Sequence, residues 1–260
     1  MEPIYILQHI RELSERLVLD GQIIHNDPLR DRVAVIVEPR RHPMLETVIR
    51  TFMYQLGDNW NLRIVTSQEN IPWIAEKLKG WCIDITPLSK NDLTTDEYSM
   101  LLMSEQFWNI MTEKHVLVFQ TDCVLFRKGV DTWIEEGYDY VGANYYNPLH
   151  VAVHIGGIQG GLSLRNREAM IECIRCASIE KVHDYRRTNG LTPLPAIIPE
   201  DIYFTHACEM LQKKIPSVEK RREFSIEADY HPRALGHHGL KFHYLTEDQQ
   251  KELISSVEDP

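Results

Sequence analysis

An aspartate follows the most apolar stretch of the sequence. Gln120, Thr121 and Asp122 come directly after the apolar run Val116–Phe119, and a second apolar run, Cys123–Phe126, comes next. A carboxylate at the end of a buried strand is held rigidly at the edge where α/β sheets bind ligands, which suits an oxygen-coordinated divalent cation. An aspartate that only caps the next turn fits the same pattern, so both interpretations stay open at this point.

Two adjacent acids, Glu200 and Asp201, follow Pro199 at the start of a predicted helix. A carboxylate within hydrogen-bond reach of a substrate hydroxyl acts as a general base. An acid in the first helical turn also stabilises the helix N-terminus, and that structural role explains one of the two. The pair is therefore a candidate for proton transfer, with helix capping as the alternative.

A glycine-rich segment, Gly156–Arg165, contains Gly160 and Gly161 and ends in a guanidinium. Glycine lets a ligand approach the backbone closely, and Arg165 is suited either to a phosphate or to steadying the strand end. The glycine spacing differs from the dinucleotide-binding fingerprint. A tight turn between two strands is the structural alternative.

Histidines gather near the C-terminus, in the segment Leu235–His243. His237 and His238 are candidate metal ligands, because neutral imidazole binds divalent metals well. Lys241 follows them and supplies a cation. Surface histidines in a glycine-rich loop are the alternative interpretation.

Strands and helices that alternate along the chain must position these residues. Short β-branched or apolar runs predict strands at Arg32–Val37, Leu62–Thr66, Trp81–Ile85, Val116–Phe119 and near Tyr140–Gly142. Helical periodicity predicts helices at Ile4–Leu19, Pro43–Gly57, Pro72–Lys79, Asp96–Met111 and Asn166–Ala177. Proline and the Asn-Gly dipeptide indicate a loop over Lys181–Ile198.

This alternation predicts an α/β fold with a mainly parallel central sheet flanked by helices. No linker divides the chain, so we expect a single main domain over residues 31–245, preceded by a helical extension (1–30) and followed by a tail (246–260). Ligands of such sheets bind at the carboxyl ends of the strands, where Glu38, Arg40 and Asp122 lie.

Composition excludes several classes of protein. The formal net charge is −10, and basic residues form no run longer than Lys220–Arg222, so a nucleic-acid partner is not expected. No apolar run approaches the roughly 18–20 residues that span a bilayer, and the N-terminus lacks the features of a signal peptide. We therefore expect a cytoplasmic protein without a membrane span; the sequence leaves its oligomeric state open.

In their order and spacing, these motifs resemble the glycosyltransferases of the GT-A type. The similarity is greatest to a group of glycosyltransferases from large DNA viruses, bacteria and fungi, and covers roughly residues 33–243. The matching segments are Val37–Pro43, Gln120–Asp122, Tyr138–Ala143, Gly160–Arg165 and Pro199–Asp201. GT-A enzymes carry Asp-x-Asp after the apolar strand; here Gln120 replaces the first acid and Asp122 keeps the second.

The resemblance implies a GT-A-like fold and transfer of a hexosyl or pentosyl group from a nucleotide-diphosphate sugar, preferentially a UDP-sugar, to a hydroxyl of a glycan or glycoprotein. It implies Mn²⁺ or Mg²⁺ at Asp122 and His238, with His237 as a competing ligand. It implies Asp201 as the base, with inversion at the anomeric carbon, and Glu200 as its helper or an acceptor ligand. The donor-binding residues would be Val37, Glu38, Arg40, Gln120, Thr121, Gly160, Gly161, Arg165 and Lys241.

Two other functions remain open at this stage. A nucleotidyltransferase shares a similar sheet and metal-bound acids, but it carries a glycine-rich loop after the first strand, where this chain reads Glu38–Pro43 without glycine. A sugar-nucleotide or glycan-binding protein without catalysis is favoured only by Gln120. Donor turnover with and without Mn²⁺ distinguishes the enzyme from the binding protein.

Overall fold

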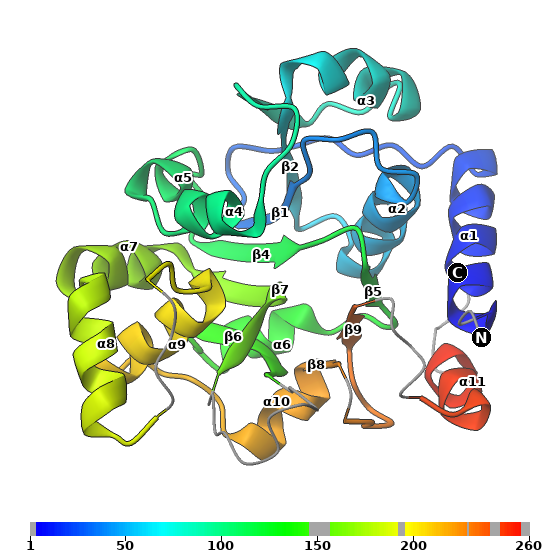
Figure 1. Cartoon of the computed structure of the whole chain (residues 1–260). Helices are drawn as coiled ribbons and strands as arrows, with labels where there is room; N and C mark the ends of the chain where they lie inside the picture. Colours follow the sequence, from blue (N-terminus) through cyan, green and yellow to red (C-terminus); the bar gives the residue numbers. More distant parts are fainter. Residues whose placement is uncertain (1–3, 146–156, 192–195, 228, 240–244, 256–260) are drawn as a thin grey trace.

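A six-stranded sheet forms the centre of the fold in the computed structural model (Figure 1), which describes residues 4–145, 157–191, 196–227, 229–239 and 245–255. The strand order is β3-β2-β1-β4-β7-β6. The strands are β1 (Arg32–Val37), β2 (Asn61–Ser67), β3 (Asp84–Leu88), β4 (His115–Phe119), β6 (Tyr140–Asn144) and β7 (Ile158–Asn166). The first four strands in this order run parallel, whereas β7 is antiparallel to β4 and β6. The predicted α/β domain with a mainly parallel sheet is confirmed.

The sheet is buried on both faces, which explains the continuous apolar runs in β1 and β4. Alternate residues of β1 enter two separate cores: Ala34 and Ile36 pack into one, and Val33 and Val35 into the other. This division follows from the period of two along a strand.

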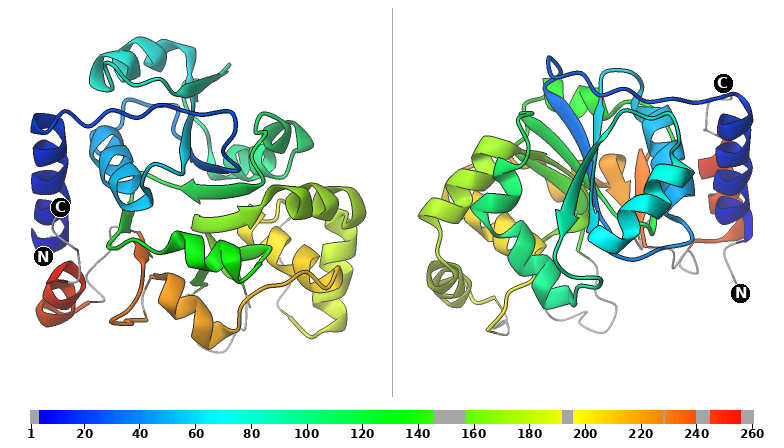
Figure 2. Two further views of the ribbon diagram at one scale, coloured as in Figure 1. Left: turned by 180° about the vertical axis from the view of Figure 1, so that it is seen from behind. Right: turned by 90° about the horizontal axis from the view of Figure 1, so that it is seen from above.

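Helices cover both faces of the sheet, and the view from above shows the resulting three layers (Figure 2). On one side lie α1 (Ile4–Leu19), α2 (Leu45–Leu56) and α11 (Glu247–Ser255), where α1 packs against both of the others. The other side carries α4 (Thr95–Leu102), α5 (Glu105–Asn109), α7 (Arg167–Cys176), α8 (Ile179–Thr188) and α9 (Glu200–Met210). The remaining helices are α3 (Ile71–Lys77) after the 3₁₀ turn η1 (Gln68–Asn70), α6 (Val130–Glu135) and α10 (Val218–Phe224).

A small second sheet lies where the chain leaves β4. It consists of β5 (Cys123–Leu125), β9 (Gly236–His238) and β8 (Ser225–Ile226), with β9 in the middle. The antiparallel pairing of β5 with β9 sets Cys123 opposite His238. Two segments that are more than 100 residues apart are thereby joined beside Asp122.

Most predicted elements are confirmed, and three need correction. The predicted loop over 181–198 begins inside helix α8, because the side chain of Ser178 caps the helix and Val182 packs into the core. The single helix predicted over 96–111 is broken into α4 and α5, since Ser104 caps a new helix. The third strand lies at 84–88 instead of 81–85.

None of the helices within the described residues is long and apolar enough to cross a membrane.

Candidate functional site

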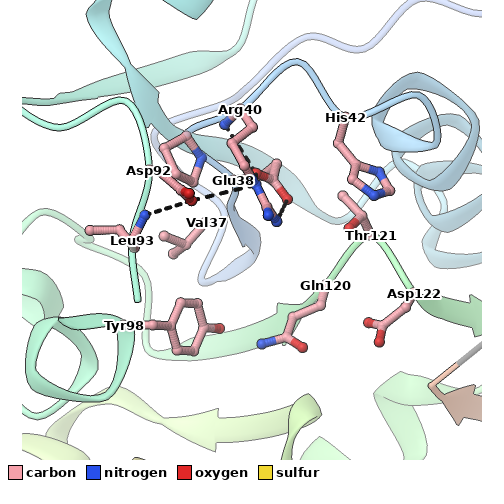
Figure 3. A pocket seen from close by; sticks show the side chains of 11 residues that line it. Val37, Glu38, Arg40, His42, Asp92, Leu93, Tyr98, Gln120, Thr121 and Asp122 are labelled. Atoms are coloured by element: carbon pink, nitrogen blue, oxygen red, sulfur yellow. Dashed lines mark hydrogen bonds and ion pairs between the residues drawn. The ribbon is translucent and has the colours of Figure 1, made fainter. Parts of the chain in front are cut away.

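A pocket of about 310 Å³ opens at the carboxyl ends of β1 and β4 (Figure 3). Six predicted residues line it together: Val37, Glu38, Arg40, Gln120, Thr121 and Asp122. The parallel pairing of β1 with β4 explains this, because it brings both strand ends to the same edge of the sheet. Six side chains that were predicted from strand ends thus lie around one pocket.

Glu38 and Arg40 form the polar rim of this pocket. The guanidinium donates from Nε and Nη2 to the two carboxylate oxygens of Glu38, at 2.9 and 3.1 Å. Thr66 and Asn70 hold the backbone of this turn by hydrogen bonds to the carbonyls of Glu38 and Arg40, at 2.7 and 2.9 Å. The Glu38 carboxylate is buried, whereas 56% of the Arg40 side chain is exposed. The rim thus presents a guanidinium that Glu38 holds in place, with Asp92 Oδ1 3.7 Å from its Nε; the exposed edge of Arg40 is the part that a ligand can reach.

Sequence analysis missed several lining residues, namely Pro39, His42, Asp92, Leu93 and Tyr98. Asp92 and Leu93 follow β3, so the same strand-end rule would have found them had this strand been placed at 84–88. Tyr98 comes from α4 and points toward Gln120 (Figure 3). Burial raises the pKa of its hydroxyl, which therefore stays protonated.

A possible cation site lies at the inner end of the pocket. Ligand atoms of Asp122, Cys123 and His238 lie within 4.8 Å of one another. His238 Nε2 is 4.0 Å from Asp122 Oδ1 and 3.3 Å from Gln120 Oε1. Asp122 Oδ1 is buried and has no hydrogen-bond partner among the described residues.

The carboxylate oxygen of Asp122 and the ring nitrogen of His238 are ligand atoms that suit a divalent cation. A buried carboxylate oxygen without a partner is costly, and a cation would satisfy it. The 4.0 Å separation is too long for a hydrogen bond and close to twice a metal–ligand distance of about 2.1 Å. Burial raises the pKa of the Cys123 thiol well above its usual value, and the thiol lies 3.0 Å from the carbonyl of Gly161, to which it donates. In this structure Cys123 is therefore a thiol that links β5 to the backbone of Gly161.

The prediction that His237 competes for this metal is corrected. Successive side chains of a strand point to opposite faces, and His237 is outside the group that His238 forms with Asp122. Its ring is 1% exposed, and burial lowers its pKa to about 3. Lys241, the predicted donor contact, lies outside the described residues.

A large bulge in β7 carries the predicted glycines. On β6, Gly142 pairs with Ser163 and Asn144 pairs with Ile158, so Ala143 alone faces the four residues 159–162. Bulges of this kind redirect side chains and are frequent beside active sites. Here the bulge turns two successive glycines toward two different groups.

Each glycine of the bulge permits a close approach that a side chain would block. A Cβ on Gly160 would lie 2.1 Å from Glu200 Oε1, and a Cβ on Gly161 would lie 2.1 Å from His238 Nε2. Gly160 and Gly161 therefore link the acids of α9 to the candidate cation site through one peptide unit. Neither glycine is among the residues that line the pocket in Figure 3.

Substitution of Gly161 by alanine tests this link. The added methyl group is expected to displace the His238 ring, since there is no space for it. We expect Mn²⁺ affinity, measured by calorimetry, to fall about 10-fold, as when the support of a metal ligand is lost. Gly157→Ala is the control, because a Cβ there makes only ordinary contacts, the nearest with Tyr145 Cβ at 3.5 Å. An unchanged Mn²⁺ affinity in Gly161→Ala would contradict the proposed role of His238.

Asp201 and Glu200 occupy the first turn of α9, but their environments differ. Asp201 is partly exposed, and its Oδ1 accepts a hydrogen bond of 2.7 Å from the N–H of Ile202. Burial and the negative charge of Glu200 raise the pKa of Asp201 to about 7. Glu200 is 4% exposed and pairs with Arg165 through contacts of 2.7 and 3.0 Å. Asp201 thus has the proton affinity that suits a base near neutral pH.

The prediction that Arg165 contacts the donor is also corrected. Its side chain is fully buried, and its nitrogens donate to Glu200, to Ser163 and to the carbonyl of Gly160. The faces of three aromatic rings offset part of the cost of burying this guanidinium. Glu200, with both oxygens bound to Arg165, is likewise engaged inside the protein.

The raised pKa of Asp201 has a measurable consequence for stability. An acid whose pKa is higher in the folded protein than in the unfolded chain stabilises the fold at low pH. That contribution is present below the ordinary aspartate pKa of about 4 and is lost as the pH rises through about 7. We expect Asp201→Asn to be more stable than the wild type by about 1–2 kcal/mol at pH 8, with a smaller gain at pH 5. Urea unfolding at the two pH values checks this; a gain that is independent of pH would contradict it.

Comparison with solved structures finds proteins of similar fold. Mouse xyloside xylosyltransferase 1, in its apo form, aligns with a TM-score of 0.55 and 10% identity over 84% of this chain and 98% of that chain. The glycosyltransferase GlyE of Streptococcus pneumoniae gives 0.47 and 14% over 88% and 61%. The mannosyltransferase PcManGT of Pyrobaculum calidifontis, in complex with GDP-Man and Mn²⁺, gives 0.43 and 16% over 82% and 62%. The likeness to the xylosyltransferase supports the predicted GT-A-like fold.

Two comparisons of the amino-acid sequence add to this structural likeness. The profile of a family described as "Protein of unknown function (DUF5672)" matches residues 83–238, which include β4, the glycine bulge, Asp201 and β9. A search of curated protein sequences gave no match.

Proposed function

The chain belongs to the DUF5672 family of proteins of unknown function, and we propose that it is a glycosyltransferase. It would move a sugar from a nucleotide-diphosphate donor to a hydroxyl of a glycan acceptor. The observation that carries this proposal is the bulge in β7, where Gly160 contacts the acids of α9 and Gly161 contacts His238 beside Asp122. The bulge thereby brings a candidate base close to a candidate cation site, in a fold that is similar to that of a xylosyltransferase.

The donor nucleotide would occupy the pocket lined by Val37, Glu38, Arg40 and Thr121. Arg40 offers its exposed guanidinium to an anion, while Glu38 fixes its orientation. The diphosphate would then extend toward Asp122, at the inner end of the pocket. UDP-sugars are the first donors to test, because the motifs of this chain resemble enzymes that use them.

Mn²⁺ or Mg²⁺ would be held by Asp122 and His238, where it would neutralise the charge that develops on the leaving diphosphate. Gln120 Oε1 lies 3.3 Å from His238 Nε2. Since Nε2 cannot donate to Gln120 and bind a cation at the same time, the cation would take the place of this hydrogen bond. Gln120, in place of the usual first acid, leaves Asp122 as the one carboxylate of this cluster, which also contains Cys123 and His238. We therefore expect weak cation binding without donor and tighter binding once the diphosphate contributes its own oxygens.

Asp201 would accept the proton of the acceptor hydroxyl as that oxygen forms its bond to the anomeric carbon and the bond to the diphosphate breaks. Attack from the side opposite the leaving group inverts the anomeric configuration. A base with a pKa near 7 is largely ionised just above neutral pH and still basic enough to take the proton. The acceptor would thus approach from the side of α9, with the donor on the side of β1 and β4.

Thermal shift with a panel of nucleotide sugars, each with and without Mn²⁺, tests this function first. A ligand that binds the folded protein raises the unfolding temperature in proportion to its occupancy and affinity. We expect one nucleotide-sugar class to stabilise the protein more with Mn²⁺ than without it. Stabilisation by nucleoside triphosphates alone would favour the nucleotidyltransferase instead.

A further inference from the structure

Every nitrogen of the Arg165 guanidinium donates a hydrogen bond within the protein, and the side chain is fully buried. Nη1 and Nη2 donate to the two oxygens of Glu200, at 2.7 and 3.0 Å. Nε donates to Ser163 Oγ at 2.9 Å, and Nη2 also donates to the carbonyl of Gly160 at 3.2 Å. This two-point geometry is the strongest arrangement that an arginine makes with a carboxylate. It fixes Glu200 relative to the bulge of β7.

Aromatic rings enclose the same guanidinium. Its carbon lies 4.9 Å from the ring centre of Tyr140, 5.4 Å from that of Phe204 and 5.9 Å from that of Trp108. Cation–π contacts of this kind stabilise a desolvated cation. A buried ion pair between β7 and α9 offers little net stability compared with apolar packing. What the pair does provide is a fixed position for Glu200 against Gly160 and next to Asp201.

The position of the pair explains why two adjacent acids differ in their chemistry. Both oxygens of Glu200 accept hydrogen bonds from Arg165, so both are directed into the protein and away from a substrate hydroxyl. Asp201 follows it on α9, and its Cβ would lie 3.0 Å from a Cβ on Gly160. Around Asp201 the charged or titratable groups are Glu200, Arg165, Tyr140 and Tyr145.

We propose that Arg165 is a positioning residue: by locking Glu200 against the glycine bulge, it makes Asp201 the acid that accepts the proton and fixes its place beside the acceptor. This inference rests on the proposed glycosyl transfer. It assigns to Glu200 a supporting role, through its negative charge, instead of contact with the acceptor. Arg165 acts through Glu200 and never touches the substrate.

Substitution of Glu200 by glutamine tests the electrostatic part of the proposal. The variant keeps the size of the side chain but removes the negative charge next to Asp201. We expect the pKa of Asp201, measured by ¹³C NMR of the carboxyl carbons and assigned with Asp201→Asn, to fall by about one unit. The acidic limb of the pH profile of kcat/KM should move to lower pH by the same amount. Glu46→Gln is the matched control, because Glu46 pairs with the buried Arg50 on α2.

Substitution of Arg165 by lysine tests whether Arg165 positions Glu200 and Asp201. It also keeps the proposal testable if Glu200→Gln does not fold. Lysine keeps the charge but cannot make the two-point contact. We expect kcat to fall about 10-fold with the donor KM unchanged and with the Asp201 titration nearly unchanged. An Asp201 pKa that stays the same in Glu200→Gln, or a wild-type kcat in Arg165→Lys, overturns the proposal. A wild-type protein without transfer activity would refute the proposed function, whereas the NMR titration would still decide the role of the pair.

Discussion

Replacement of Asp201 by asparagine is expected to lower kcat of glycosyl transfer by about 10³-fold, within the range that general-base catalysis supplies. The amide has nearly the same shape but cannot accept the proton of the acceptor hydroxyl. Because Asp201 lies on α9, outside the donor pocket formed at β1 and β4, the affinity for the nucleotide sugar should stay at its wild-type value. Transfer rates and calorimetric donor binding, measured on the same preparation, check both parts.

Asp96→Asn is the matched control for this variant. Asp96 is also the second residue of a helix, α4, but it is exposed and outside the pocket. It should leave transfer unchanged, so that a general effect of losing an acid near a helix N-terminus is ruled out. A wild-type kcat in Asp201→Asn would remove Asp201 from the mechanism.

Replacement of Asp122 by asparagine is expected to abolish the dependence of donor binding on Mn²⁺. An amide cannot offer the charged oxygen that is buried in the wild type without a hydrogen-bond partner among the described residues. We expect donor affinity in saturating Mn²⁺ to fall about 100-fold, since charge neutralisation by a metal contributes several kcal/mol. In the absence of Mn²⁺, wild type and variant should bind the donor equally.

The control for Asp122→Asn is Asp92→Asn, an exposed acid that lines the same pocket outside the cation cluster. It should shift donor affinity by a similar factor with and without Mn²⁺. Calorimetric titrations of all three proteins in both conditions separate the two effects. An unchanged Mn²⁺ dependence in Asp122→Asn would show that the cation binds elsewhere.

The pocket could be predicted from the sequence because its residues follow strands with strong apolar patterns. Val37 and Asp122 are placed by β1 and β4, two strands buried on both faces, and parallel pairing brings such strand ends together. The same rule failed for Asp92, because β3 is a half-buried edge strand whose pattern gives no clear boundary. Local periodicity therefore located the strand ends of β1 and β4 better than the part of the pocket that follows β3.

Contacts made by tertiary packing could not be predicted in the same way. In the sequence, Arg165 suits either a phosphate or the support of a strand end, and only the fold shows it buried between β7 and α9. His237 and His238 are equivalent as sequence neighbours; the pairing of β9 with β5 decides which of them faces Asp122. Similarly, the role of Cys123 depends on a bulge that the glycine spacing alone does not reveal.

Glycosyl transfer is tested most directly by following a nucleotide sugar by ¹H NMR in the presence of the protein, Mn²⁺ and a mixture of glycan acceptors. The sugar should be chosen by thermal shift as the one that binds best. We expect release of the nucleoside diphosphate and a new anomeric signal of inverted configuration, with both absent in Asp201→Asn. Tight donor binding without any release of diphosphate, in the presence or absence of Mn²⁺, would contradict this expectation and identify a binding protein.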